Sequence, residues 1–393
     1  MKSTLEFFLN GKKQVLRHPD PSQTVLEYIR STGLTGTKLG CQEGGCGACT
    51  LTLSEWNPEA QRPHYYAING CIVPIIALDG KHVMTVEGIG NSKVPHAAQE
   101  RIAVFHGSQC GFCTPGIVMS LYSLLRETEG NPSREQLTEA FDGNLCRCTG
   151  YKPIIDAAST FVEGGDGGCC GKEGGCCKQN GINKKIPEPH KLREYPHAEL
   201  IFPPSLKKYQ PELLELEDQF GHLWYRPTSL SQLVELLKQN PGAKMVGGAS
   251  EFQIEAKIKG DIHQVCIYVL DVPELKIFQR VPEGVRIGGN IPLSDLENRL
   301  DALVEELPSS QTQFYQAVLT QLKYFAGRQI RNVATPAGNI ATASPISDLN
   351  PVFVSANVKL EVLDPETGEI STIKMGEFDD PFFVGYRKFS NSP

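Results

Sequence analysis

The sequence predicts an α+β protein that is divided into several domains. Three observations support this prediction. The chain has 393 residues, of which 40% are hydrophobic and 21% charged, and this is enough to build two to four separate cores. The first segment alternates apolar and polar residues as strands do, whereas the segment after residue 113 repeats them with a helical period. Strand and helix patterns then alternate again beyond residue 216.

The composition excludes several classes of function. The net charge of −7 and the scattered Lys and Arg residues argue against binding of nucleic acid or of an anionic membrane surface. The first residues lack the apolar core of a signal peptide, and no apolar run is long enough to span a membrane. We therefore expect a reducing compartment, the cytoplasm, with the peroxisome as the alternative. Thirteen cysteines in such a compartment indicate metal or redox chemistry rather than disulfides.

Residues 1–88 are expected to form a small β-rich domain. Apolar residues alternate over 5–9 as in a strand, and the Asn10-Gly11 pair that follows is a strong hairpin signal. Residues 24–32 then place their apolar side chains on one face of a helix. Strands around one helix, with a cysteine loop after it, are the arrangement that a β-grasp fold of the ferredoxin type needs.

The cysteine loop reads CQEGGCGACT. Cys41, Cys46 and Cys49 have the spacing C-x4-C-x2-C, and Cys71 follows in a segment that reads as a strand. This spacing is typical of plant-type [2Fe-2S] proteins. The alternative is a structural zinc site, although zinc motifs usually show paired C-x2-C units.

Glycines accompany these cysteines. They permit positive φ and expose backbone N–H groups, so the loop can wrap closely around a cluster. The glycines in question are Gly40, Gly44, Gly45 and Gly47.

A second group of cysteines predicts a helical domain over 89–164. Cys110 and Cys113 stand as C-x2-C, Cys146 and Cys148 as C-x-C, and each pair precedes a helical pattern. Thiolates at helix N-termini are stabilised by free N–H groups and by the helix dipole. A helical four-cysteine site would hold a second cluster. Taken alone, this spacing would also suit zinc or a redox dithiol.

The helices of this domain have their own sequence signals. Thr114 is the expected cap of the first, with Pro115 in its first turn. Ser133 and Gln136 form a capping box ahead of another helix, and a last helix is expected over 153–162.

The chain resembles the N-terminal part of the xanthine dehydrogenases, and fungal-like ones in particular. These enzymes belong to the molybdenum hydroxylase family, which also contains aldehyde oxidases. The matching stretches are GCQEGGCGACT, TVEGIG, HGSQCGFCTPGIVMS and GNLCRCTGYKPI. The resemblance implies that Gln109 touches the molybdopterin cofactor; otherwise Gln109 would be an ordinary polar residue at a helix start. It also implies an outer and an inner [2Fe-2S] cluster, held respectively by Cys41, Cys46, Cys49 and Cys71 and by Cys110, Cys113, Cys146 and Cys148.

Residues 165–215 are rich in Gly, Lys and Pro with few apolar residues, and a linker is expected there. Cys169, Cys170, Cys176 and Cys177 within it could suggest a zinc site of the form CC-x5-CC. Adjacent cysteines do not easily chelate one ion, however, and a glycine-rich loop is a poor scaffold. We favour exposed, redox-sensitive thiols.

Residues 216–393 are expected to form the third domain. They begin with a strand and an amphipathic helix in HLWYRPTSLSQLVELL. A strand ending at Val246 then runs into Gly247 and Gly248, whose N–H groups could bind a pyrophosphate. A plain turn between two strands is the alternative.

The resemblance implies that this third domain binds FAD and has the PCMH-type α+β fold, incomplete at its C-terminus. One flavin segment lies at the Gly-Gly turn and the second lies in FAGRQIRNVATPAGNIATASPISDLNP. The FAD-binding residues that it implies are Met245, Val246, Gly247, Gly248, Ala249, Ser250, Glu251, Phe252, Phe325, Thr335, Gly338, Asn339, Thr342 and Asp348.

Within this set the resemblance places Asp348 on the ribityl or ribose side of FAD, and Asn339 and Thr342 at the pyrophosphate. The chain also departs from the family. Ala249 replaces an amide side chain of mammalian members, and Phe252 replaces a smaller aliphatic residue. We expect the backbone contacts to be kept and one polar contact to the flavin to be lost.

The resemblance implies a role in electron transfer. In the family, hypoxanthine or xanthine is oxidised to urate at a molybdopterin centre, and the electrons pass through the two clusters to FAD and then NAD. The sequence stops inside the flavin domain as the family has it, so we expect no molybdenum domain and no activity of the chain alone.

The resemblance also implies a molybdopterin-binding domain or subunit as the partner, and a homodimer for the complete enzyme. The alternatives are a separate iron-sulfur and flavin carrier subunit of an aldehyde oxidase or other purine hydroxylase, and an inactive fragment.

Overall fold

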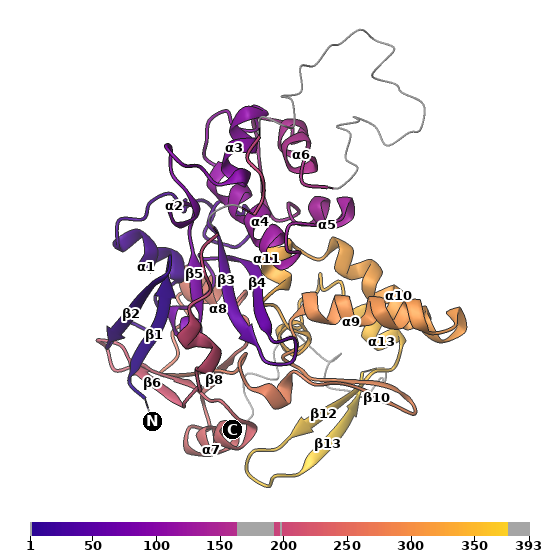
Figure 1. Ribbon diagram of the computed structural model, residues 1–393. Helices are drawn as coiled ribbons and strands as arrows, with labels where there is room; N and C mark the ends of the chain where they lie inside the picture. The colour runs from indigo at the N-terminus through magenta and orange to yellow at the C-terminus, as the bar shows by residue number, and fades with distance from the viewer. Residues whose placement is uncertain (1, 163–191, 197–198, 376–393) are drawn as a thin grey trace.

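The computed structural model describes residues 2–162, 192–196 and 199–375, and these confirm an α+β protein of several domains (Figure 1). The linker cysteines Cys169, Cys170, Cys176 and Cys177 lie outside the described residues, as does the segment 376–393.

The first domain is a five-stranded sheet with one main helix, α1 (Val25–Ser31). Its strand order is β2-β1-β5-β3-β4, in which β1 and β5 are parallel and the other neighbours antiparallel. Asn10 and Gly11 have φ of 49° and 79°, as a tight hairpin between β1 and β2 requires. The bounds are β1 (Thr4–Leu9), β2 (Lys12–Arg17), β3 (Thr50–Asn57), β4 (Arg62–Asn69), η1 (Ile75–Leu78) and β5 (His82–Met84).

The second region is helical and lies above the first sheet in Figure 1, with α4 packed against β3 and β4. Ser133 and Gln136 form the predicted capping box. The cap of α4 is Cys113 rather than Thr114, and Pro115 lies in its first turn as expected. The helices are α2 (Val86–Ile89), α3 (Ala97–Val104), α4 (Thr114–Glu127), α5 (Arg134–Glu139) and α6 (Lys152–Ser159).

The third region contains a four-stranded sheet of order β6-β7-β9-β8, in which β7, β9 and β8 run parallel. The predicted strand and amphipathic helix are β7 (Leu223–Arg226) and α7 (Leu230–Gln239). The remaining elements around this sheet are η3 (Pro204–Lys208), β6 (Leu214–Glu217), β8 (Lys244–Val246), α8 (Phe252–Ile254), η4 (Glu255–Lys259), β9 (Val265–Tyr268) and η5 (Pro273–Leu275).

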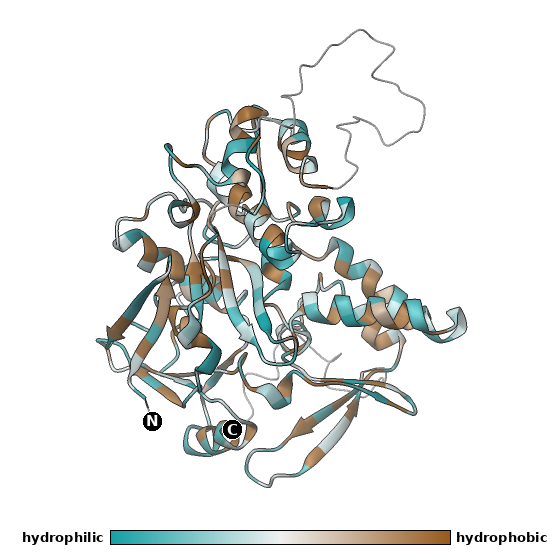
Figure 2. Ribbon diagram, in the orientation of Figure 1, coloured by the Kyte–Doolittle hydropathy of each residue, from teal (hydrophilic) through white to brown (hydrophobic). Residues whose placement is uncertain are grey.

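Helices α9 (Leu293–Glu306) and α10 (Ser309–Tyr324) pack together beside two hairpins. Both helices show apolar and hydrophilic segments in alternation in Figure 2, as amphipathic helices do. The further elements are β10 (Phe278–Val281), β11 (Gly284–Ile287), α11 (Arg328–Arg331), α12 (Pro336–Thr342), α13 (Asn350–Ser355), β12 (Lys359–Leu363) and β13 (Ile370–Lys374).

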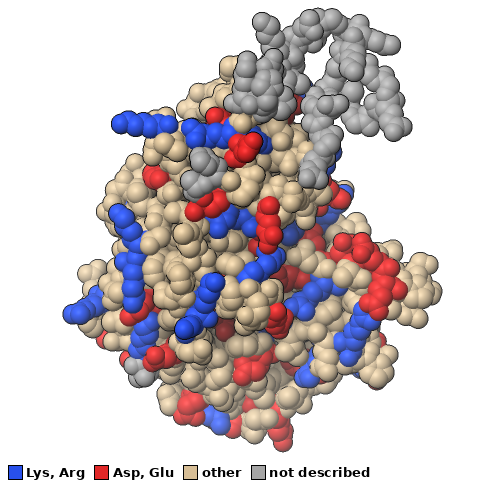
Figure 3. All heavy atoms as spheres, viewed as in Figure 1, with Lys and Arg blue, Asp and Glu red and all other residues tan. Residues whose placement is uncertain are grey.

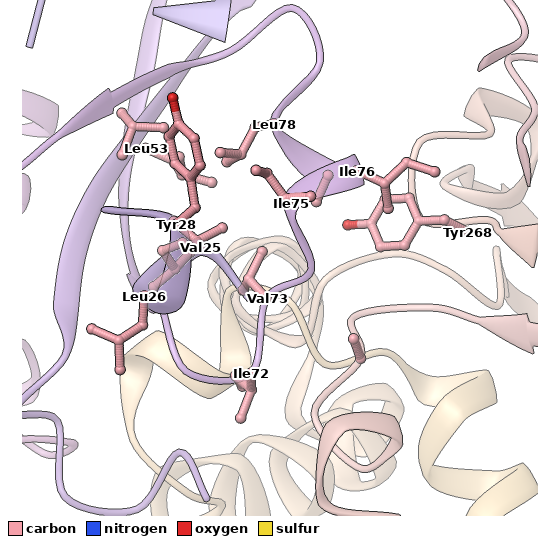
Figure 4. Packing of buried hydrophobic residues seen from close by; sticks show 14 of the residues in the cluster. Val25, Leu26, Tyr28, Leu53, Ile72, Val73, Ile75, Ile76, Leu78 and Tyr268 are labelled. Carbon is pink, nitrogen blue, oxygen red and sulfur yellow. The ribbon is translucent and has the colours of Figure 1, made fainter. Parts of the chain in front are cut away.

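The first and third regions share one apolar core. Ile72 and Ile76 of the first region belong to the same buried cluster as Trp224, Tyr268 and Val333 of the third. Figure 4 shows Tyr268 beside Ile76 at this junction. Because burial of this surface requires both partners, the two regions are held together hydrophobically.

Buried ion pairs cross the same junction. Arg226 contacts Asp271 at 2.9 Å and Asp79 at 3.3 Å, and Lys81 contacts Asp271 at 3.2 Å and Glu55 at 3.3 Å. Arg226 and Asp271 come from the third region, and the other three residues from the first. Each buried charge therefore has an opposite charge next to it, as buried charges require.

Part of the expected linker is packed on both cluster regions instead. His96 and Arg126 contact the carboxylate of Glu199 at 2.7 and 3.2 Å. Phe202 lies against Trp56 with ring centroids 6.1 Å apart. The composition was misleading because a few anchoring side chains, spaced among many polar residues, are enough to fix an extended segment.

Charged residues of both signs are interspersed on the face shown in Figure 3. Across residues 2–162, 192–196 and 199–375, no helix is both long and apolar enough to cross a membrane.

Candidate cofactor sites

The structure brings together the four cysteines of the first predicted set. The Cys41 and Cys46 backbone N–H groups each donate to the other residue's Sγ at 3.4 Å. The Cys49 and Cys71 thiols are both buried and lie close enough for each to shift the pKa of the other. Cys71 lies just after β4, which ends at Asn69, rather than inside the strand as expected.

The loop around these thiols needs its glycines for two different reasons. Gly44 and Gly47 have φ of 76° and 66°, whereas Gly40 and Gly45 do not adopt the left-handed region. A Cβ on Gly40 would lie 2.7 Å from the Sγ of Cys46, so the absence of a side chain there lets the thiol approach.

Backbone N–H groups stabilise the thiolate form of Cys41. Burial raises the pKa of this thiol, but hydrogen bonds from the N–H groups of Glu43 and Cys46 outweigh it, so the pKa lies below its ordinary value. The Glu43 N–H donates to Sγ at 3.4 Å. Because iron binds thiolate, this environment favours metal binding.

The second set also converges. Cys110 and Cys148 lie close enough for each thiol to shift the pKa of the other, and so do Cys113 and Cys146. Cys146 is buried, whereas Cys110 and Cys148 are exposed. The thiols of this set therefore reach from the interior to the surface.

The two cysteine loops touch each other. The Leu145 N–H donates to the carbonyl oxygen of Cys46 at 3.0 Å, and Asn144 Nδ2 donates to the carbonyl oxygen of Gly47 at 3.2 Å. A Cβ on Gly116 would lie 2.2 Å from that same Gly47 oxygen, so the start of α4 also approaches closely.

Both sets suit a binuclear cluster. A [2Fe-2S] cluster takes four thiolates shared between two irons. Each set supplies four thiols grouped in two contacting pairs, and the first set adds N–H donors for sulfur. Among the described residues, no three or more His, Cys, Asp or Glu side chains surround a single ion position. The cysteines lie in pairs, as two irons with two thiolates each require, and not as a mononuclear zinc site does.

The predicted flavin turn follows β8 as expected. A Cβ on Gly248 would lie 1.8 Å from the carbonyl oxygen of Val333, so only glycine fits between this turn and the segment before α12. Ala249 has φ of 59°, a conformation that residues other than glycine adopt uncommonly. The turn is therefore shaped by its approach to residues 333–335.

The start of α12 lies beside the turn. Thr335 caps this helix by accepting a hydrogen bond from the Gly338 N–H at 3.1 Å, and a Cβ on Gly247 would lie 3.4 Å from the Thr335 Oγ1. Asn339 Oδ1 accepts from the Ser347 hydroxyl at 2.8 Å. The structure thus brings the two predicted flavin segments together at Gly247 and Thr335.

The other predicted residues lie around this contact. Phe252 is buried with its ring edge on Trp224, at 5.2 Å between centroids, and Phe325 packs in the apolar cluster of α9 and α10. Val246 is buried, and Ser250 and Glu251 are partly exposed. The predicted FAD-binding residues that are exposed are Met245, Gly338, Thr342 and Asp348. Gln109 is exposed beside Cys110.

Sequence reasoning missed four residues of these sites. Asn144 and Gln329 form a buried polar contact between domains, Lys257 approaches Cys71, and Asn290 is buried beside Gly247. Asn144 had one available signal, its position two residues before Cys146. The other three depend on tertiary contacts that no local pattern reveals.

Three segments of the chain match known families. Residues 7–75 match the family described as 2Fe-2S iron-sulfur cluster binding domain, and residues 85–159 match the [2Fe-2S] binding domain family. Residues 216–390 match the family described as FAD binding domain in molybdopterin dehydrogenase. The chain is therefore an iron-sulfur flavoprotein of the molybdenum hydroxylase class.

Full-length relatives specify the family more closely. The chain is 50% identical over 98% of its length to a xanthine dehydrogenase of Blastobotrys adeninivorans, and 49% identical over 99% to that of Emericella nidulans. It spans only 31% and 29% of these relatives. Among solved structures, one match is the crystal structure of quinoline 2-oxidoreductase from Pseudomonas putida 86, with 35% identity and a TM-score of 0.34. This match covers 39% of the present chain and 89% of the quinoline 2-oxidoreductase chain. The chain belongs to the xanthine dehydrogenase family.

Proposed function

We propose that this chain is the electron-transfer portion of a xanthine dehydrogenase-like enzyme, which oxidises hypoxanthine and xanthine to urate. Its partner is a molybdopterin-binding domain or subunit, and the expected location is the cytoplasm. When bound, two [2Fe-2S] clusters and FAD carry the electrons from the molybdopterin centre towards NAD.

The observation that carries this proposal is the direct contact between the two cysteine loops. Leu145 precedes Cys146 of the inner set and donates its N–H to Cys46 of the outer set at 3.0 Å. The two sets are therefore adjacent, with a single hydrogen bond between their backbones. On its other side, the outer loop packs on the flavin domain, because a Cβ on Gly44 would lie 2.8 Å from Ile330.

The two sets of proposed cluster ligands differ in their neighbours and in the exposure of their cysteines. In the outer set, Cys49 and Cys71 are buried and Cys41 is exposed. This set is adjacent to the flavin domain, and it would pass electrons on. The inner set has exposed members at Cys110 and Cys148, where a molybdopterin partner could approach. Gln109 is exposed beside them and is proposed to face that cofactor. The turn at 247–251 and the start of α12 would hold the FAD.

The experiment is a metal and spin analysis of the purified chain. We expect about four irons and four acid-labile sulfides per chain, and two separate EPR signals after reduction. Cys148→Ser should remove one signal and leave the other. Cys266→Ser, which changes a buried cysteine outside both sets, is the matched control and should keep both signals. Zinc in place of iron, without visible absorption, would refute both cluster assignments.

A further inference from the structure

A lysine of the flavin domain reaches a ligand residue of the outer set. The ammonium of Lys257 donates a hydrogen bond of 3.1 Å to the carbonyl oxygen of Cys71, although 186 positions separate the two residues in sequence. Its side chain is 26% exposed, and the nearest acidic partner, Glu27, lies at 3.6 Å. The contact therefore places a partly exposed positive charge beside the backbone of Cys71.

The local fold explains why this side chain points there. Lys257 belongs to η4, a short π-helix that directly continues α8. Short π-helical segments are rare, and those that occur are frequently found at functional sites. The preceding residues dock on the first domain: Gln253 is 2% exposed and donates to the carbonyl oxygen of Ser22 at 3.3 Å, while Ala256 packs against the shared apolar core.

A single nearby charge should affect the reduction potential of a cluster held by the outer set. Cys49 and Cys71 are 2% and 1% exposed, so solvent and salt screen their surroundings weakly. A one-electron reduction adds one negative charge to a cluster. A fixed cation nearby stabilises the reduced form more than the oxidised form, which raises the reduction potential.

We propose that Lys257 raises the reduction potential of the outer cluster and thereby favours electron transfer from the inner cluster towards the flavin domain. This inference depends on the proposed function, because it requires that Cys41, Cys46, Cys49 and Cys71 hold a [2Fe-2S] cluster. Glu27 acts in the opposite sense: its carboxylate partly neutralises Lys257, and it is half-exposed, so its effect is smaller.

The test is a reductive titration of the full chain with both clusters, followed by EPR at set potentials. Lys257→Met should lower the one-electron reduction equilibrium constant of the outer cluster by about threefold to tenfold; tenfold corresponds to about 59 mV. The inner-cluster potential should stay unchanged. Lys257→Arg keeps the positive charge and should therefore keep the wild-type potential. A purely structural role for Lys257 would predict no such dependence of the potential on charge.

Two further variants keep the proposal testable even where Lys257→Met folds poorly. Glu27→Gln should raise the outer-cluster potential, and Gln at this position can still serve the capping box of α1. Lys259→Met is the matched control on η4: Lys259 is 60% exposed, pairs with acidic residues of its own domain, and should leave both potentials unchanged.

The outcomes separate this inference from the proposed function. Two wild-type EPR signals, with a potential that does not respond to Lys257→Met or Glu27→Gln, would overturn the role of Lys257 alone. Equal shifts of both clusters would overturn it too, because they would indicate a general change of the protein. Absence of the two signals from the wild-type chain would overturn the proposed function and this inference together.

Discussion

Gln329 of α11 donates a hydrogen bond of 2.9 Å to the side-chain oxygen of Asn144, and Asn144 in turn donates to the carbonyl oxygen of Gly47 at 3.2 Å. This chain of two bonds joins the flavin domain, the helical domain and the outer cysteine loop. Gln329 and Asn144 are 0% and 4% exposed, and Ser120 contacts both. Because buried polar groups depend on their partners, the three domains are coupled at this point.

We predict that Asn144→Ala destabilises the chain by about 1–3 kcal/mol, because Gln329 and the Gly47 carbonyl each lose one buried hydrogen bond and keep only their contacts with Ser120 and Thr50. It should also broaden the outer-cluster EPR signal, since the loop at Gly47 loses a support. Urea unfolding and EPR of the reduced chain measure the two effects. Asn131→Ala, at an exposed position, is the control and should change neither. Equal behaviour of the two variants would contradict the coupling.

Gly47→Ala should abolish the outer-cluster signal. A Cβ at this position would lie 2.1 Å from the carbonyl oxygen of Gly143, and the φ of 66° is unfavourable for alanine. Gly45→Ala is the matched control in the same loop, because its Cβ would meet nothing within 4 Å. EPR and iron content distinguish them. If both variants keep four irons, the close packing of the two loops is not needed for cluster binding.

The features that the sequence predicted correctly are local ones. The Asn10-Gly11 hairpin, the Ser133 capping box and the strand ending at Val246 each depend on a few neighbouring residues. The two cysteine sets were predicted from their spacing along the chain, and their role as cluster ligands stays a prediction. Both sets do converge in the structure.

The contacts between domains were not predictable in this way. Gln329 and Asn144 are 185 positions apart, Lys257 and Cys71 186, and Glu199 and His96 103. Apart from Cys71, which accepts through its backbone carbonyl, the residues of these pairs are polar and of types that are common on protein surfaces. Their burial follows from how the domains pack, and no periodicity or motif encodes it.

Gly248→Ala should weaken FAD binding by at least about tenfold while both cluster signals remain. The new Cβ would lie 1.8 Å from the carbonyl oxygen of Val333, so the turn must move away from the start of α12. Flavin retained after gel filtration measures this effect. Gly242→Ala, where a Cβ meets nothing within 4 Å, should retain as much flavin as the wild type. Equal retention by Gly248→Ala would contradict the proposed flavin site.

Asp271→Asn should destabilise the junction between the first and third domains by about 3–5 kcal/mol, because it removes one member of a buried ion-pair network. Arg226 and Lys81 would lose their shared carboxylate, at 2.9 and 3.2 Å. The measurement is the urea unfolding midpoint at neutral pH. Glu306→Gln, which breaks an exposed pair with Arg280, should leave the midpoint nearly unchanged. A similar small effect of both variants would show that the buried network contributes little.

The pH dependence of the free energy of unfolding should reflect the protonation of His82, which is buried in β5. Burial lowers the pKa of this imidazole from 6.5 to about 4, and the positive charge of Arg126 adds to the shift. The neutral ring accepts a hydrogen bond of 3.0 Å from the Gly11 N–H through Nε2. Because the unfolded chain binds a proton on this residue more readily, the stability that neutral His82 provides is present above pH 6.5 and is lost as pH falls towards 4.

We therefore predict that the free energy of unfolding falls by about 1 kcal/mol from this residue between pH 7.5 and 5.5. Urea unfolding at the two pH values measures the change. His82→Gln should flatten the dependence, because a glutamine oxygen can accept from Gly11 without titrating. His18→Gln, at an exposed position, should keep the wild-type dependence. If His82→Gln retains the full fall in stability, another group is responsible, and the imidazole of His82 is not held neutral by its burial.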